Sequence, residues 1–306
     1  MYDLIIVGGG PAGFTSAIYA RRSGKSVLVL EKESFGGQIA SSPKIENYPS
    51  LKSASGVELI NMMMEQAESL GAEFDIDEIK HIEKKENVFY LEGEYNNYQA
   101  LSVILCTGCK HRELQANHIE DFLDNGVSYC AVCDGDFYKG KDVCLVGDAN
   151  TALQYALLLS DLCNHVYICT LFDRFFGEQC SVDAIYERKN ITIYHNVKLL
   201  DVLGTDEIEQ LVFENTQDSS KLNLKVSGLF VAIGQVPNND NFKNLADLDE
   251  FGYFDSDESC KTKTPGLFVA GDCRKKFLRQ VSTATSDACV ATTSAVAYLN
   301  TLKKAD

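Results

Sequence analysis

The sequence predicts an α/β protein with two doubly wound domains, and three observations lead to this prediction. A unit of strand, glycine-bearing turn, helix and strand opens the chain, and a second unit of this kind begins at Asp142. This order is typical of parallel sheets whose strands are joined by crossover helices. A chain of 306 residues is also long enough for two hydrophobic cores, because a single core stops growing near this size.

The first unit starts with an apolar strand over Leu4–Val7, continues with a helix to about Arg22 and ends with a strand over Val27–Leu30. Further elements are predicted between the two units. They are the helix Gly56–Leu70 and strands near Glu73–Ile82, Val88–Glu92 and Ala100–Cys106.

The turn of the first unit reads Gly8-Gly9-Gly10-Pro11-Ala12-Gly13, which matches the G-x-G-x-x-G fingerprint of dinucleotide-binding units. In such a turn Gly8 makes the bend, Gly10 admits a pyrophosphate and Gly13 lets the helix approach the strand. The N-terminus of the helix favours the phosphates. Glu31, at the end of the next strand, is placed to hydrogen-bond a ribose. We therefore expect a bound dinucleotide here.

The second unit has a degraded version of this turn. Its turn reads Gly147-Asp148-Ala149-Asn150-Thr151-Ala152, so Ala149 stands where the middle glycine belongs. The predicted elements of this unit and of the rest of the chain are strands Val143–Val146, His165–Thr170 and Gly228–Ile233, the helix Asn150–Leu162 and a long helix from about Ser282.

The segment Cys130-Ala131-Val132-Cys133-Asp134 contains a C-x-x-C pair just before the second unit. Two thiols at this spacing form an exchangeable disulfide, and the motif lowers the pKa of a thiol so that a thiolate is available to attack. A nucleotide-binding fold with an internal dithiol can take electrons from a cofactor and pass them on as thiols. This combination indicates a flavin disulfide reductase.

A zinc site is an alternative reading of these cysteines. Cys106 and Cys109 form another C-x-x-C pair, and the spacing to Cys130 falls within the range of four-cysteine zinc sites. Cys106 ends an apolar strand, however, so we expect no metal. The other cysteines are scattered in apolar runs, which is typical of buried thiols in a reducing compartment.

The composition excludes several other classes of protein. A net charge of −16 argues against binding of nucleic acid. No apolar run approaches the length of a membrane span, and Met1 leads straight into the first strand without a signal peptide. We therefore expect a cytoplasmic protein.

Taken in order, these residues resemble the low-molecular-weight thioredoxin reductases over nearly the whole chain. The family's FAD-binding elements correspond to Gly8, Gly10, Pro11, Ala12, Gly13, Glu31, Lys32, Gly36-Gly37-Gln38, Glu46-Asn47-Tyr48-Pro49, Thr107, Gly108, Gly271, Asp272, Arg279, Gln280 and Val281. The resemblance implies that Asp272 binds the ribityl and pyrophosphate region of FAD. Arg279 and Gln280 would lie beside the isoalloxazine ring.

The resemblance also implies a Rossmann-like architecture in which the second domain is inserted into the first. The FAD domain would comprise 1–113 and 243–306, and residues 114–242 would form a nicotinamide-type domain that carries the redox pair. Members of the family are usually homodimers. A domain rotation with hinges near 111–116 and 238–243 would bring the disulfide from the flavin to thioredoxin.

The chain departs from the family where NADPH should bind. NADPH-dependent members have an intact second fingerprint and a His-Arg-Arg-x-x-x-Arg run that neutralises the 2′-phosphate. The aligned stretch is Thr170-Leu171-Phe172-Asp173-Arg174-Phe175-Phe176, so all three arginine positions are lost. Ala149 would also crowd a pyrophosphate. We therefore expect no bound NADP.

These losses resemble those of the ferredoxin-dependent flavin thioredoxin reductases, which implies ferredoxin as the electron donor. The transfer is downhill by roughly 6 kcal/mol for two electrons from a plant-type ferredoxin to thioredoxin. The basic segment Arg274-Lys275-Lys276 follows the flavin aspartate, so we expect it to dock ferredoxin, although a solvated basic loop is an alternative.

The family also implies the roles of the redox segment. Cys133 would face the flavin as the charge-transfer thiolate, Cys130 would attack the disulfide of thioredoxin, and Asp134 would supply or accept the proton. Two other functions stay open: thioredoxin reduction by NAD(P)H through an atypical pocket, and a flavin redox sensor without turnover. The effect of Ser286-Asp287-Ala288 on access to the flavin is open as well.

Overall fold

The computed structural model describes residues 1–42, 45, 47–123 and 125–302. The chain forms two compact units. Unit 1 comprises Met1–Lys110 and Val236–Asp306, and unit 2 comprises His111–Gln235. The boundaries expected from the sequence, 113/114 and 242/243, lie a few residues further along the chain. On the C-terminal side the reason is that Asn239 and Phe242 are buried within unit 1.

Unit 1 is built on a seven-stranded sheet with the order β3-β2-β1-β6-β5-β4, in which β17 pairs with β6. Strand β1 pairs in parallel with β2 and β6, and β17 also runs parallel to β6. The strands are β1 (Tyr2–Val7), β2 (Val27–Glu31), β3 (Glu73–Ile76), β4 (Ile79–Lys85), β5 (Val88–Gly93), β6 (Asn97–Leu105) and β17 (Leu267–Val269).

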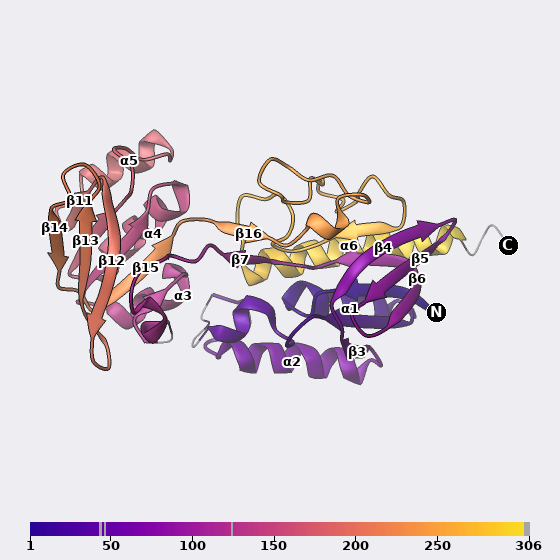
Figure 1. The fold of residues 1–306 in the computed structure, drawn as a ribbon. Helices are drawn as coiled ribbons and strands as arrows, with labels where there is room; N and C mark the ends of the chain where they lie inside the picture. The colour runs from indigo at the N-terminus through magenta and orange to yellow at the C-terminus, as the bar shows by residue number, and fades with distance from the viewer. Residues whose placement is uncertain (43–44, 46, 124, 303–306) are drawn as a thin grey trace. The chain divides into compact units, whose positions relative to one another are not determined.

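The apolar residues of β1 alternate between two cores of unit 1. Leu4 and Ile6 pack with the helices α1 (Pro11–Arg22) and α6 (Val281–Leu302) on one face of the sheet. Ile5 and Val7 point to the other core, with residues of β4, β5 and the segment before β17. Because β1, β2, β6 and β17 run parallel, their carboxyl ends meet at one edge of the sheet. The neighbouring strands β4, β5 and β6 lie side by side in Figure 1.

The prediction of a single strand near Glu73–Ile82 is wrong, because the structure has two strands there. They are separated by Asp77 and Glu78, and β4 runs antiparallel to β5. The break is held by the Asp77 carboxylate, which accepts hydrogen bonds from the backbone N–H groups of Tyr95 and Asn96 and from the Tyr98 hydroxyl. A polar group with this many local partners ends a strand that hydrophobicity alone would continue.

Unit 2 is built on a parallel sheet with the order β11-β10-β9-β15-β8. One face packs against α4 (Asn150–Leu162) and α5 (Gln179–Tyr186), and the other packs against an antiparallel sheet. The strands of unit 2 are β8 (Val127–Ser128), β9 (Asp142–Gly147), β10 (His165–Cys169), β11 (Ile191–Tyr194), β15 (Gly228–Ala232) and, in the antiparallel sheet, β12 (Val197–Gly204), β13 (Ile208–Asn215) and β14 (Lys221–Leu224).

The remaining elements are short, apart from α2. The helix α2 (Gly56–Ser69) begins with a capping box between Ser55 and Glu58, which satisfies backbone groups at its N-terminus. The short elements are η1 (Gly37–Ser41), β7 (Cys109–His111), η2 (Ile119–Phe122), α3 (Ala131–Asp134), η3 (Gly135–Tyr138), β16 (Gln235–Pro237) and η4 (Asp240–Phe242). In the described part of the chain, no helix has both the length and the hydrophobicity that crossing a bilayer requires.

Candidate active site

The glycine turn between β1 and α1 is closely packed. A Cβ on Gly8, whose φ is +113°, would lie 2.1 Å from the carbonyl oxygen of Cys106. A Cβ on Gly13 would lie 1.9 Å from the carbonyl oxygen of Gly8. Larger residues would therefore push α1 away from the end of β1. The helix starts with Pro11 and Ala12 directly after Gly10, so the backbone N–H groups of its first turn that lack an intrahelical partner lie at this edge of the sheet.

A second glycine turn faces the first one. The N–H of Gly36 donates a hydrogen bond to the carbonyl oxygen of Gly9 at 2.8 Å, and Gly37 opposes Gly10. The nearest atom to a Cβ built on Gly10 is the carbonyl oxygen of Gly36, 3.7 Å away. Two facing glycines thus leave a cradle that side chains would fill. Such a cradle suits a phosphate bound by backbone N–H groups.

Beside this cradle lies a cavity of about 80 Å³. Gly8, Glu31, Lys32 and Thr107, all predicted from the sequence, contribute to its lining. The Glu31 carboxylate accepts hydrogen bonds from the backbone N–H groups of Gly9 and Lys32, each at 2.8 Å, so it also holds the turn in place. Residues that sequence reasoning missed complete the lining, among them Asp77, Ile79, Asn238 and Phe242.

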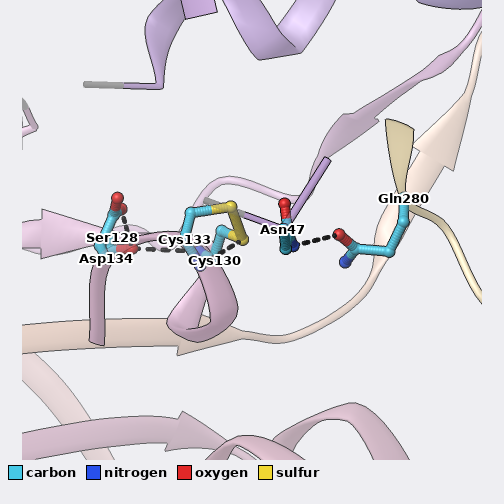
Figure 2. The surroundings of a disulfide bond; sticks show 6 residues. All are labelled: Asn47, Ser128, Cys130, Cys133, Asp134 and Gln280. Atoms are coloured by element: carbon cyan, nitrogen blue, oxygen red, sulfur yellow. Dashed lines mark hydrogen bonds between the residues drawn. A yellow bond between two sulfur atoms is a disulfide. The ribbon is translucent and has the colours of Figure 1, made fainter. Parts of the chain in front are cut away.

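The other predicted residues of this edge are also in unit 1. The Thr107 hydroxyl donates to the side-chain oxygen of Asn239 at 2.7 Å, and Gly108 follows with a φ of +63°. The Asn47 amide donates to the side-chain oxygen of Gln280 at 3.1 Å (Figure 2). Gln38 lies in η1, and Val281 begins α6. Glu46 lies outside the described residues.

Asp272 follows β17 at the same edge of the sheet. Burial raises the pKa of its carboxyl to about 6, although Lys276 and Arg279 oppose this shift. Its Oδ1 atom is buried and has no hydrogen-bond partner among the described residues. Arg279 donates to the carbonyl oxygen of Asp272 and lies 4.0 Å from the ring centroid of Tyr253. A buried acceptor without a partner fits a polyol such as the ribityl chain of FAD.

The basic docking patch expected at Arg274, Lys275 and Lys276 is wrong. Arg274 and Lys276 are buried and both form ion pairs with Asp287, at 2.9 and 2.6 Å. Arg274 also donates to the backbone carbonyl oxygens of Ser256 and Asp257. Only Lys275 is exposed. Buried cations need a close anion, and Asp287 is this anion, so the segment braces the interior of unit 1.

Asp287 gives the segment Ser286-Asp287-Ala288 a structural role. Besides the two cations, its carboxylate accepts a hydrogen bond from the backbone N–H of Gly271 at 3.2 Å. Gly271 has a φ of +87°, and a Cβ there would lie 3.0 Å from the Cβ of Ala12. Asp287 therefore fixes the turn that carries Asp272 close to the start of α1.

The redox segment lies in unit 2, at the carboxyl end of β8. Cys130 and Cys133 form a disulfide with their Cα atoms 5.3 Å apart (Figure 2). Disulfide-bonded sulfurs are not thiolates, so this pair does not offer zinc ligands in this state. The N–H of Cys133 lies 3.2 Å from the sulfur of Cys130 and donates to it. A backbone donor aimed at this sulfur would stabilise a thiolate at Cys130.

Asp134 lies on the same short helix as the disulfide. Burial raises the pKa of its carboxyl, and a hydrogen bond from Ser128 opposes this shift. The Ser128 hydroxyl donates to Oδ2 at 2.6 Å, whereas Oδ1 is buried and has no hydrogen-bond partner among the described residues. A carboxyl group with a raised pKa next to a disulfide can hold a proton and release it. Sequence reasoning missed Ser128.

The nucleotide end of unit 2 differs from that of unit 1. Ala149 precedes α4 in extended backbone, with φ −109° and ψ −178°, and it carries a Cβ at the place in the turn where Gly10 of unit 1 has none. In the loop after β10, roughly half of the surface of each of Leu171, Phe172 and Phe176 is exposed. Arg174 is the one cation of residues 170–178, and its guanidinium lies 5.2 Å from the ring centroid of Phe176. This edge presents rings and acids where a phosphate would need cations.

Comparison with known proteins identifies the family. Residues 2–288 match the family described as pyridine nucleotide-disulphide oxidoreductase. The chain is 37% identical to the "34.2 kDa protein in rubredoxin operon" of Clostridium pasteurianum, over 97% of each chain. It is 34% identical to a thioredoxin reductase of Listeria innocua, over 100% of this chain and 96% of the relative.

Solved structures agree with the sequence relatives. The crystal structure of a thioredoxin reductase from Streptococcus pyogenes matches with a TM-score of 0.90 and 32% identity, covering 98% of this chain and 99% of the other. Its match supports the predicted fold of two Rossmann-like nucleotide-binding domains, and the family is one for which FAD is expected. The chain therefore belongs to the pyridine nucleotide-disulphide oxidoreductase family, among the flavin-dependent enzymes that resemble thioredoxin reductase.

Proposed function

We propose that this protein reduces the disulfide of thioredoxin through Cys130 and Cys133, with electrons that reach its FAD from reduced ferredoxin. The observation that carries the proposal is the redox segment itself. It joins a disulfide, a backbone donor to the Cys130 sulfur and a half-buried carboxyl with a raised pKa within the five residues from Cys130 to Asp134. A structural disulfide needs neither the donor nor the acid.

Unit 1 would hold the FAD. The cradle between Gly10 and Gly37 and the N-terminus of α1 would bind the pyrophosphate, and Asp272 would accept a hydrogen bond from the ribityl chain. The cavity lined by Glu31 and Lys32 would accommodate part of the adenosine half. When bound, FAD supplies the electron pair that reduces the Cys130–Cys133 disulfide to two thiols.

The exchange with thioredoxin then balances without any further reagent. The sulfur of Cys130 loses its proton to the Asp134 carboxylate and attacks one sulfur of the thioredoxin disulfide. The bond between the two thioredoxin sulfurs breaks, and the leaving thiolate takes the proton from Asp134. Cys133 next attacks Cys130 and releases the second thioredoxin sulfur, which takes the proton of Cys133. Two thiols and one disulfide thus become one disulfide and two thiols.

The proposal of ferredoxin as the donor depends on the nucleotide end of unit 2. The loop after β10 contains Phe172 and Phe176 where arginines would neutralise a 2′-phosphate, and its one cation lies against a ring. The turn before α4 and the loop after β10 also contain the acids Asp148 and Asp173, whose carboxylates would oppose an added phosphate.

A second candidate donor is NAD(P)H. The relatives named thioredoxin reductase favour it, since the matched family is named for pyridine nucleotides. Under this alternative, the exposed rings of Phe172 and Phe176 would contact the adenine, and Arg174 would be the remaining cation. We also keep the homodimer as a prediction, which a molar mass measured in solution would test.

Substitution of Cys130 tests the role of the dithiol. The Cys130→Ser variant should keep bound FAD that can still be reduced, while thioredoxin reduction should fall by at least about a thousandfold because the attacking sulfur is lost. The matched control is Cys180→Ser, since Cys180 is an exposed cysteine of the same unit. Turnover that persists in Cys130→Ser would exclude this dithiol as the route of the electrons.

A further inference from the structure

Ser128 lies at the point where the redox segment leaves the sheet of unit 2. It is the last residue of β8, and its backbone is in register with Phe230 of the neighbouring strand β15. Its side chain is buried, with 6% of its surface exposed. A side chain held by a parallel strand has a fixed direction, so it can fix the direction of the groups that it touches.

The Ser128 hydroxyl touches both functional parts of the redox segment. It donates a hydrogen bond to Oδ2 of Asp134 at 2.6 Å and accepts one from the backbone N–H of Cys130 at 3.0 Å (Figure 2). One hydroxyl thus uses its donor on the acid and a lone pair on the residue that carries the attacking sulfur. No other hydrogen bond from a described side chain reaches the Asp134 carboxyl.

We propose that Ser128 is a positioning residue, which sets the orientation of the Asp134 carboxyl relative to the Cys130 sulfur and favours its ionised form. This inference rests on the proposed exchange reaction and deepens it. By donating to the carboxylate, Ser128 makes the acid able to take the proton from Cys130. By accepting from Cys130, it keeps the sulfur and the acid on one rigid loop.

Among the described residues, two phenols are the other titratable groups that interact with Asp134. Tyr138 follows in η3, and Tyr155 projects from α4. Burial and the Asp134 charge raise the pKa of both phenols, so both are neutral at the pH of the reaction. Apart from the two sulfurs, Ser128 is therefore the contact among the described residues that distinguishes the two charge states of Asp134.

The test is the pH profile of disulfide exchange by the complete, FAD-containing protein. The enzyme is reduced with dithiothreitol, freed of the reductant and mixed with oxidised thioredoxin or with 5,5′-dithiobis(2-nitrobenzoate). The inflection that disappears from the profile of Asp134→Asn is the one caused by titration of the Asp134 carboxyl. In Ser128→Ala this inflection should move upward by about one pH unit, because a hydrogen bond to a charged group is lost. Ser128→Thr, which keeps the hydroxyl, should restore the profile.

Ser160→Ala is the matched control, because Ser160 is also a buried hydroxyl of unit 2 but donates to the carbonyl oxygen of Leu157. An unshifted profile in Ser128→Ala, or an equal shift in Ser160→Ala, would overturn the proposal. Ser128→Gly provides the same loss of the hydroxyl if the alanine variant does not fold. If neither the wild type nor any variant reduces thioredoxin but all reduce 5,5′-dithiobis(2-nitrobenzoate), thioredoxin is refuted as the partner. The pH profiles measured with the small disulfide then decide the role of Ser128.

Discussion

Each unit carries a half-buried carboxyl group after a strand of its parallel sheet, and the surroundings of these two groups differ. Asp272 follows β17, which pairs with β6, and Asp134 follows β8, which pairs with β15. In both groups burial raises the pKa, and in both Oδ1 has no partner among the described residues. Lys276 and Arg279 oppose the shift at Asp272, whereas only a neutral hydroxyl does so at Asp134. The two cations favour the ionised form of Asp272, which suits a hydrogen-bond acceptor for a ligand. The neutral hydroxyl beside Asp134 suits an acid that gains and loses a proton.

The turns that precede α1 and α4 have a similar backbone but differ at one side chain. Gly10 and Ala149 precede their helices in nearly the same extended conformation, with φ of −90° and −109°. In both units a later loop donates to the turn, from Gly36 to Gly9 and from Phe176 to Asp148. The backbone path therefore does not distinguish the two turns. The side-chain Cβ of Ala149, which Gly10 lacks, is the difference on which the prediction of no bound NADP depends.

The largest effect should follow from Lys276→Glu, which tests whether the acids of unit 1 depend on buried cations. The new carboxylate would then face that of Asp287, and the free energy of unfolding should fall by about 3–5 kcal/mol. Lys275→Glu, at an exposed position beside Asp255, should change it by less than about 0.5 kcal/mol. Chemical denaturation measures both. Equal effects of the two variants would contradict the burial of Lys276.

A smaller effect, with a pH dependence, should follow from Asp272→Asn in the FAD-free protein. Because the folded pKa of about 6 lies above the ordinary value of 3.8, the stability contribution of this group is present below pH 4 and lost as the pH rises through 6. The asparagine variant should therefore be more stable than the wild type by about 3 kcal/mol at pH 7.5 and by less than about 1 kcal/mol at pH 4. Urea unfolding at both pH values measures this. A difference that does not change with pH would refute the raised pKa.

The comparison of the two turns is tested by copying the alanine of unit 2 into unit 1. In Gly10→Ala the backbone conformation is already available to alanine and the new Cβ has 3.7 Å to its nearest neighbour, so the FAD-free protein should keep its stability. The affinity for FAD should fall at least about tenfold, because the Cβ enters the phosphate cradle. The content of FAD after dialysis and its Kd report the change. Ala149→Gly should leave both unchanged, and an unaffected Kd in Gly10→Ala would show that the cradle is not the phosphate site.

Local patterns in the sequence predicted most of the elements that position these sites. The helix Asn150–Leu162 has the predicted bounds, and the helices near Pro11–Arg22 and Gly56–Ser69 differ by at most a residue or so. These elements depend on periodicity and on glycines whose constraints are local. The fold of two Rossmann-like domains followed from them.

The failures arose where a residue's partner lies far along the chain or in an unforeseen turn. Arg274 and Lys276 read as a basic surface, because nothing in their own segment shows that Asp287 at the start of α6 neutralises them. The strand near Glu73–Ile82 was broken by Asp77, whose partners lie beyond residue 94. Nothing in the sequence distinguishes Ser128 from other strand serines, because its two hydrogen bonds depend on the folded redox segment.

The central claim is that the Cys130–Cys133 dithiol receives electrons through FAD without a nicotinamide nucleotide in unit 2. Anaerobic bleaching of the flavin tests it directly, with NADPH, NADH and reduced ferredoxin added in separate cuvettes. We predict rapid bleaching by reduced ferredoxin and none by either nucleotide on the same timescale. Rapid bleaching by NADPH or NADH would contradict the claim and assign unit 2 to nucleotide binding through an atypical pocket.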